Sequence, residues 1–218
     1  YAITEVYLCR EMFVHSKYPE VLDSLPVEVI TDISPAVFAK IAYRENSDGV
    51  VVLARPKSHT LEELTLGENP FLILLESVEK PGNLGAVLRT ADAAAVDAVI
   101  ICDPQTDLYN PNVIRSGVGG LFTVQTALCT SEEALTWLQQ HQISIFAAEL
   151  QAAEFYQEID FRPPSAIVMG TEADGLTGLW LRNATKRIKI PMRGKIDSLN
   201  VSVSTAILTF EAMRQRGF

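Results

Sequence analysis

The sequence predicts an α/β fold: a mostly parallel sheet with helices on both faces, preceded by a small α/β domain. From Phe71 onward, short and nearly continuous apolar segments alternate with segments of helical periodicity, a pattern typical of parallel strands buried on both sides. A polar segment that contains proline and glycine, without sustained periodicity, precedes this region. We therefore expect a small domain at residues 1–54, a linker at 55–69 and the larger domain at 70–218.

The first domain carries signals for one helix and several strands. A Ser-Pro pair at 34–35 is typical of a helix start, here for a helix that ends near Tyr43. Because Tyr1 leads almost directly into a strand without an initiator Met, we expect this domain to lack an N-terminal portion. β-type runs occupy residues 3–8, 27–30 and 49–54.

The larger domain is predicted to alternate strands and helices along its whole length. Strands are expected at residues 71–75, 98–102, 122–126, 143–148, 166–169 and 186–190. Helices are expected near residues 83–95, 111–118, 131–141, 176–183 and 199–216.

The last predicted helix carries apolar residues on more than one side. One stripe contains Val203, Ile207 and Phe210. Leu208, Ala212 and Met213 begin a second stripe. A simple amphipathic helix would show only one, so the pattern indicates burial on two sides, with a second subunit as a candidate for one of them.

Composition and sequence signals are those of a globular protein. The hydrophobic fraction is 48% and the charged fraction is 21%. No apolar run approaches the roughly 18 residues of a membrane span and no signal peptide is recognisable, so no membrane contact and a cytoplasmic setting are expected. Cysteines and histidines are scattered, which favours buried free thiols over disulfides and indicates no metal site.

Charge is distributed unevenly along the chain. The net charge of −9 by itself argues against a nucleic-acid partner. However, residues 180–218 carry eight bases against two acids, whereas residues 130–174 carry eight acids against one base. This distribution favours a surface that faces a polyanion over a merely solvated basic face. The bases that flank the loop before the last helix are Arg182, Lys186, Arg187, Lys189, Arg193 and Lys195.

The first of three polar motifs is the segment from Glu79 to Ala91. It places Asn83 at the start of a helix, where capping of the helix is an equally good explanation for this residue taken alone. Arg89 lies one and a half turns later, off the packing face, and could reach a crevice beyond the strand ends. That packing face is formed by Leu84, Val87, Leu88 and Ala91.

The second and third motifs also follow predicted strands. In Val168-Met-Gly-Thr-Glu-Ala-Asp-Gly-Leu176, two glycines bracket a tight turn, which lets a ligand approach the backbone closely and holds Glu172 at the carboxyl edge of the sheet. An ordinary contact of this acid with the helix dipole is the alternative. The third motif runs from Ile190-Pro-Met192 to Ser198-Leu-Asn200, a strand-to-helix junction where backbone amides often hold small ligands. A capped helix also explains Ser198.

In their order and spacing, the three motifs resemble those of the SpoU-type (TrmH-like) RNA ribose 2′-O-methyltransferases of the SPOUT class. The resemblance covers residues 70–218 and includes the stretch from Asp107 to Arg115. It implies a C-terminal trefoil knot, which general topology rules would not predict, and S-adenosylmethionine as the cofactor. Residues 1–54 resemble, more loosely, the latter part of a small RNA-binding domain that many members carry.

The resemblance also implies roles for individual residues. Arg89 is the key catalytic residue, and because arginine stays protonated at neutral pH, we expect it to orient an RNA phosphate and stabilise charge instead of acting as a base. The family further implies a homodimer that pairs through the last helix, and no metal. The hydrogen-bond network around Arg89 and the ribose is formed by Asn83, Glu172, Ser198 and Asn200. Cofactor contacts fall on Gly170, Ile190, Met192 and Leu199, with Ala148 at a neighbouring strand end.

The RNA substrate and two rival functions remain open at this point. Ribosomal RNA is favoured because the front domain suits it, and transfer RNA is the alternative. A non-catalytic RNA-binding module of the same fold is one rival, which the presence of all five polar positions disfavours. An enzyme that methylates a base nitrogen is the other, and the combination of Ser198-Leu-Asn200 with Asn83 and Arg89 favours ribose chemistry instead.

Overall fold

The structure, a computed structural model, divides into two compact units, Tyr1–Ser58 and His59–Phe218. Their boundary lies inside the segment expected to be a linker. The second half of that segment belongs to the larger unit, because the buried ring of His59 contacts Thr126 and the Tyr109 hydroxyl there. The structure describes residues 1–13, 24, 26–43, 47–196 and 198–217.

The small unit contains a three-stranded sheet in the order β2-β1-β3 and one helix. The central strand is parallel to β2 and antiparallel to β3. The helix starts as predicted, with the Ser34 hydroxyl accepting a hydrogen bond from a backbone N–H of the first turn and Pro35 in the first position. The predicted run at 27–30 is mostly a 3₁₀ turn. The elements are β1 (Ala2–Leu8), β2 (Ile30–Asp32), α1 (Pro35–Ile41) and β3 (Val50–Arg55).

The larger unit is built on a seven-stranded sheet in the order β6-β5-β4-β9-β7-β10-β8. Every pairing in this sheet is parallel, in agreement with the predicted α/β class. The central strands β4 and β9 are buried along their whole length, which explains their continuous apolar sequences. The strands are β4 (Phe71–Glu76), β5 (Ala98–Cys102), β6 (Thr126–Cys129), β7 (Ser144–Ala148), β8 (Glu154–Phe155), β9 (Ser165–Met169) and β10 (Lys186–Lys189).

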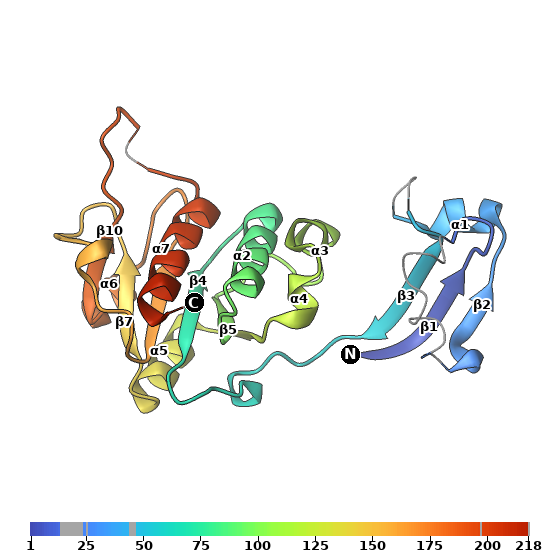
Figure 1. The fold of residues 1–218 in the computed structure, drawn as a ribbon, viewed down its shortest axis with the longest axis horizontal. Helices are drawn as coiled ribbons and strands as arrows, with labels where there is room; N and C mark the ends of the chain where they lie inside the picture. The colour runs from blue at the N-terminus through green and yellow to red at the C-terminus, as the bar shows by residue number, and fades with distance from the viewer. Residues whose placement is uncertain (14–23, 25, 44–46, 197, 218) are drawn as a thin grey trace. The chain divides into compact units, whose positions relative to one another are not determined.

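Helices cover both faces of this sheet and create two cores (Figure 1). The side chains of β4 alternate between them: Ile73 and Leu75 belong to one core, and Leu72 and Leu74 to the other. The first core is closed by α2 (Pro81–Ala93), α3 (Pro111–Gly117), α4 (Gly120–Thr123) and α7 (Val201–Arg216). The second is closed by α5 (Ser131–Gln140) and α6 (Gly178–Asn183).

The strand predicted at residues 122–126 is wrong over most of its length. Its beginning belongs to the short helix α4, and β6 starts only at Thr126. Local residues of this stretch favour a strand, but packing against α2 decides otherwise. Gly120 lies so close to α2 that a Cβ on it would stand 2.8 Å from the Leu88 carbonyl oxygen.

Helix α7 buries one apolar stripe and exposes another. It runs beside α2 on one face of the sheet (Figure 1). Leu208 and Ala212 are buried in the core below it. In contrast, Val203 and Phe210 keep 48% and 42% of their surface exposed. The two stripes predicted from the sequence therefore have different environments within one protomer.

Arg216, in the last turn of α7, ties the end of this helix to the amino-terminal ends of the central strands. The guanidinium of Arg216 stacks over the ring of Phe71, and its carbon lies 5.3 Å from the centre of that ring. Burial lowers the pKa of Arg216 from its usual value, yet an arginine remains charged at neutral pH. Its guanidinium donates hydrogen bonds of 2.7–3.2 Å to the carbonyl oxygens of Asn69, Pro70, Phe161 and Pro163 and to the Ser165 hydroxyl.

Replacing this guanidinium should therefore destabilise the larger unit. Arg216→Met leaves the carbonyl oxygens of Asn69 and Pro163 without a donor among the described residues and removes one donor each from Pro70 and Phe161, so we expect the free energy of unfolding to fall by about 3 kcal/mol. Arg214→Met is the matched control, because Arg214 lies in the same turn but pairs with Glu211 at an exposed position, which should cost no more than about 1 kcal/mol. Urea unfolding of both variants measures the difference, and equal stabilities would contradict the structural role of Arg216.

Candidate functional site

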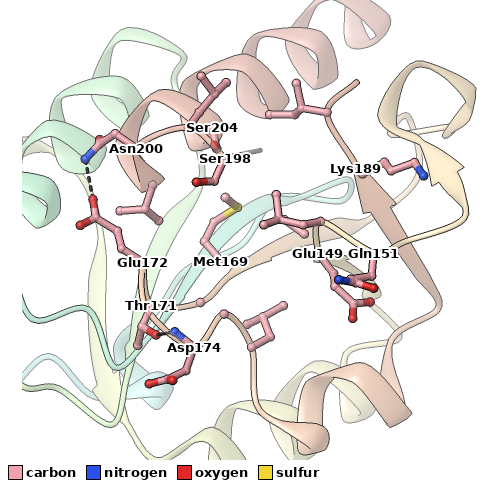
Figure 2. Close-up of a pocket in the computed structure, with 18 of the residues that line it drawn as sticks. Glu149, Gln151, Met169, Thr171, Glu172, Asp174, Lys189, Ser198, Asn200 and Ser204 are labelled. Atoms are coloured by element: carbon pink, nitrogen blue, oxygen red, sulfur yellow. Dashed lines mark hydrogen bonds between the residues drawn. The ribbon is translucent and has the colours of Figure 1, made fainter. Parts of the chain in front are cut away.

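The three polar motifs meet at the carboxyl edge of the large sheet. Glu172, in the turn after β9, accepts hydrogen bonds at Oε1 from the side-chain amides of Asn83 and Asn200, at 3.0 Å and 2.6 Å. The Asn200 amide is also 3.1 Å from Asn83 Oδ1. Figure 2 shows Asn200 pointing toward Glu172 across the mouth of the site. Three segments that are distant in sequence are thus joined through one carboxylate.

The two asparagines have different local roles. Asn200 is the N-cap of α7, where its Oδ1 accepts hydrogen bonds from the Ser202 N–H and hydroxyl. Asn83 is not a cap: α2 begins earlier, with Lys80 at the N-cap and Pro81 at the first position. The capping explanation of Asn83 is therefore wrong, and its side chain serves the contact with Glu172 and Asn200.

Lys80 is a member of this cluster that the sequence did not reveal. Its ammonium group forms an ion pair with Glu172 Oε2. The pKa of Glu172 is lowered from its ordinary value of 4.5, first by the Lys80 contact and then by the Asn83 hydrogen bond. No local pattern could have indicated this pair, because its two residues are 92 positions apart.

A pocket of about 580 Å³, here called the central pocket, opens beside the Glu172 cluster. In Figure 2, Glu172 and Asn200 lie at one end of it and Lys189, Glu149 and Gln151 at the other. Its size is ordinary for a small-molecule site. All five residues predicted to bind a cofactor line it, namely Ala148, Gly170, Ile190, Met192 and Leu199, together with the predicted polar residues Glu172, Ser198 and Asn200.

The walls of the central pocket combine apolar and acidic groups. Met169, Leu176 and Leu208 give it an apolar floor. Its charged lining consists of three carboxylates and one lysine, and two of the carboxylates also pair with bases outside the lining: Glu149 with Arg187, and Glu172 with Lys80. With these partners counted, three carboxylates face three bases, so the charges around the pocket nearly balance and suit a small ligand with apolar parts better than a polyanion.

Position 170 requires glycine because of the turn itself, and not because a ligand approaches the backbone there, as expected from the sequence. A Cβ on Gly170 would stand 2.2 Å from the carbonyl group of Gly175 and 2.5 Å from the Leu176 nitrogen. The turn itself, closed by backbone hydrogen bonds between Thr171 and Gly175, occupies that space. Gly175 adopts φ +70°, which favours glycine. Substitution of Gly170 would therefore disrupt the turn before it affected any ligand.

Two predicted residues stand apart from the cluster. Ser198 lines the central pocket, but among the described residues no hydrogen bond joins it to Glu172. Arg89 is exposed on α2 and lines neither the central pocket nor the cavity of about 110 Å³ beneath Asn83. Within one protomer the structure thus brings together Asn83, Glu172 and Asn200 and leaves Arg89 outside.

The described residues give no sign of a metal centre or a membrane span. They contain no group of three or more His, Cys, Asp or Glu side chains that could hold a metal ion. Among the same residues, no helix is both long enough and apolar enough to cross a membrane. Cys9, Cys102 and Cys129 are free thiols, the first two of them buried.

Comparisons with known proteins place the geometry in context. The sequence model of the SpoU rRNA methylase family matches residues 70–210. The 23S rRNA (guanosine-2′-O-)-methyltransferase of Pectobacterium atrosepticum is 38% identical over 151 residues, which is 69% of this chain and 62% of that protein. A crystal structure of an RNA 2′-O ribose methyltransferase superposes with a TM-score of 0.82 at 39% identity, covering 98% of this chain and 81% of the other. An rRNA methyltransferase from Sinorhizobium meliloti, solved with bound AdoMet, gives a TM-score of 0.85 at 26% identity, with coverages of 97% and 80%.

The Lys80–Glu172 ion pair generates a pH prediction. A carboxyl group whose pKa is lowered by folding stabilises the protein above its unfolded pKa, and this contribution is lost as the pH falls through the lower folded value. We expect the Glu172 carboxyl carbon to titrate below 4.5 in an NMR experiment, and Lys80→Met to move its midpoint upward. Lys186→Met is the control, since Lys186 pairs with Glu154 instead. An unchanged midpoint in Lys80→Met would disprove the pairing.

Proposed function

This chain belongs to the SpoU rRNA methylase family, and we propose that it is an S-adenosylmethionine-dependent RNA methyltransferase that methylates a ribose 2′-hydroxyl. The observation that carries the proposal is the convergence of all three motifs on one pocket edge, with Glu172 hydrogen-bonded to Asn83 and Asn200. Ribosomal RNA is the favoured substrate, because the matching family model and the Pectobacterium relative are both named for rRNA methylation. Transfer RNA is the alternative substrate.

The central pocket fits S-adenosylmethionine in size and charge. The cofactor carries a carboxylate, an ammonium and a sulfonium, so it is cationic overall, and Asp174, a lining carboxylate that forms no ion pair with a described residue, is available to its cationic part. It supplies an electrophilic methyl group on that sulfonium. The residues that would hold it are Ala148, Gly170, Ile190, Met192 and Leu199.

In this proposal the Glu172 cluster positions groups and does not accept the proton. Oε1 of Glu172 already receives two amide donors and Oε2 an ammonium group, so three of its roughly four lone pairs are engaged. Its lowered pKa keeps it ionised at neutral pH and makes it a weak base. The cluster therefore fixes the start of α2 and the start of α7, which together frame the entrance to the pocket.

Arg89 would act on the RNA and not on the cofactor. An exposed guanidinium without a hydrogen-bond partner among the described residues is available to bind a phosphate in a bidentate manner. Such a contact would orient the ribose and stabilise the negative charge that develops on the 2′-oxygen as its proton leaves. Its distance from the central pocket of its own protomer is consistent with a site completed by a second subunit.

The finer features of the fold are part of this proposal. A trefoil knot is supported by the way the segment 189–200 shares one pocket with the turns after β7 and β9, before α7 returns to pack beside α2. A homodimer is supported by the exposed apolar stripe of α7. For the unit Tyr1–Ser58, RNA contact is proposed on the family resemblance.

The Arg89 mechanism is tested by methyl transfer from labelled cofactor to total RNA, with the 2′-O-methyl positions mapped afterwards. We expect Arg89→Ala to keep its cofactor affinity and thermal stability but to lose transfer activity equivalent to about 2–4 kcal/mol of barrier. Arg89→Lys should restore little of the transfer activity, because an ammonium group cannot bind a phosphate in the bidentate manner of a planar guanidinium. Arg162→Ala, an exposed arginine that pairs with Asp160 before β9, is the control and should transfer normally. Normal transfer by Arg89→Ala would remove the central residue of the mechanism.

The dimer is tested at the exposed stripe of α7. Val203→Asp with Phe210→Asp should yield a monomer, because two charges would be buried without partners at the subunit contact. Both side chains are exposed in the protomer, so the unfolding free energy of the monomer should change little. Light scattering measures the mass. A native protein that is already monomeric at micromolar concentration, or a variant that remains dimeric, would contradict the use of this stripe.

A further inference from the structure

The bases near the end of the chain fall into two groups when their partners are considered. Lys186 forms an ion pair with Glu154 at 2.6 Å, and Arg187 with Glu149 at 3.5 Å. In contrast, Lys189, Arg193 and Lys195 form no ion pair with any described residue. The charge of the first group is largely compensated locally, whereas the charge of the second is not.

The three uncompensated bases line a second pocket of about 630 Å³, here called the basic pocket. Its other walls come from residues after β7, including Leu150, Phe155 and Gln157, and from the loop that follows β10. No acidic residue of the described chain lines it. In a protein of net charge −9, such a concave site with three free cations is suited to an anionic ligand.

The basic pocket adjoins the central pocket but differs from it in charge, because its bases face no carboxylate among the described lining residues, whereas the charges around the central pocket nearly balance. The two share Leu150, Lys189, Ile190 and Met192 as a common wall. The cofactor proposed for the central pocket is cationic overall, so a second set of cations beside it does not serve cofactor binding. A polyanionic substrate that must lie next to the cofactor would use them.

An exposed aromatic ring gives the basic pocket a second kind of contact. Phe155, which lines the basic pocket, keeps 38% of its surface exposed. The Lys189 ammonium lies 5.2 Å from the centre of its ring, so the π-face of the ring is within reach of a ligand group at the pocket and already has a cationic neighbour. Nucleic-acid bases stack on such rings when they are unpaired, and duplex RNA keeps its bases stacked on one another.

We propose that the basic pocket binds an unpaired nucleotide of the substrate RNA, with its base against Phe155 and the neighbouring phosphates at Arg193 and Lys195. This inference rests on the proposed function, because it takes RNA to be the substrate. The pocket then selects substrates whose modified region is single-stranded, and it contributes to RNA binding without contacting the methyl group.

Fluorescence anisotropy with an unstructured oligouridylate and with an RNA duplex tests the pocket in the full chain. Arg193→Gln with Lys195→Gln should weaken oligouridylate binding on the order of tenfold at 0.1 M salt and reduce the salt slope by about 1.4, the value for two phosphate contacts on a single strand. Arg162→Gln with Arg214→Gln removes the same charge at two exposed, ion-paired positions outside both pockets and should change binding little. Equal losses in the two double variants would overturn the proposal.

The aromatic contact is tested separately. Phe155→Ala should weaken oligouridylate binding about tenfold but leave duplex binding unchanged. Phe155→Leu keeps the apolar bulk without the π-face and should behave in the same way, which excludes misfolding as the cause. Loss of duplex and single-strand binding in parallel would overturn the stacking role.

Two further measurements separate this inference from the proposed function. Calorimetric titration with S-adenosylmethionine should give the native affinity in every variant of the basic pocket, and a lost affinity would assign these residues to the cofactor site instead. If the native protein transferred no methyl group to RNA, the proposed function would fail, while the binding comparison would still decide the pocket. If methyl transfer were normal in the native protein and in all pocket variants, the function would stand and the pocket inference would fall.

Discussion

The hydrogen-bonded contact of Glu172 with Asn83 and Asn200 is the constraint on which the rest of the site depends. It joins segments that are 89 and 28 residues apart in the chain. Such a contact is available only because the strands that precede these segments are parallel, so their carboxyl ends reach the same edge of the sheet. With Lys80 on its second oxygen, Glu172 has donors on both sides and cannot rotate freely. The entrance of the central pocket is therefore set by one side chain.

The same contact fixes one end of α7, and Arg216 fixes the other. Asn200 caps the helix and holds it to Glu172, whereas the Arg216 guanidinium binds the carbonyl groups at the opposite edge of the sheet. A helix held at both ends loses little further conformational freedom when a partner packs on it, which lowers the entropic cost of association. The turn around Gly170 is likewise closed by its own backbone hydrogen bonds, so much of the pocket wall is formed before a ligand binds.

The sequence predicted the order of elements well because strong periodicity and apolar strands are local signals, as in Phe71–Glu76 and Ala98–Cys102. It failed where tertiary packing overrides local preference, as in the short helix at Gly120–Thr123. Of the predicted polar residues, Asn83, Glu172 and Asn200 meet in the structure, but the Lys80–Glu172 pair carries no local signal. The sequence also did not predict that Arg89 lies away from the cluster. Its spacing along the helix shows that it is off the packing face, but not whether it points toward the pocket or toward solvent.

Net charge was the weakest of the sequence arguments, and the structure explains why. At physiological ionic strength, charges interact over about 8 Å, so a ligand responds to the groups around its site and not to the sum over the chain. Ion pairs with Glu154 and Glu149 compensate Lys186 and Arg187, whereas three nearby bases retain their charge in the basic pocket. A protein of net charge −9 can thus carry a locally cationic pocket beside one whose charges nearly balance. Between Lys186 and Lys195 the paired bases come first and the unpaired ones follow, so in our proposal the RNA would meet uncompensated positive charge in the basic pocket and not along the whole segment.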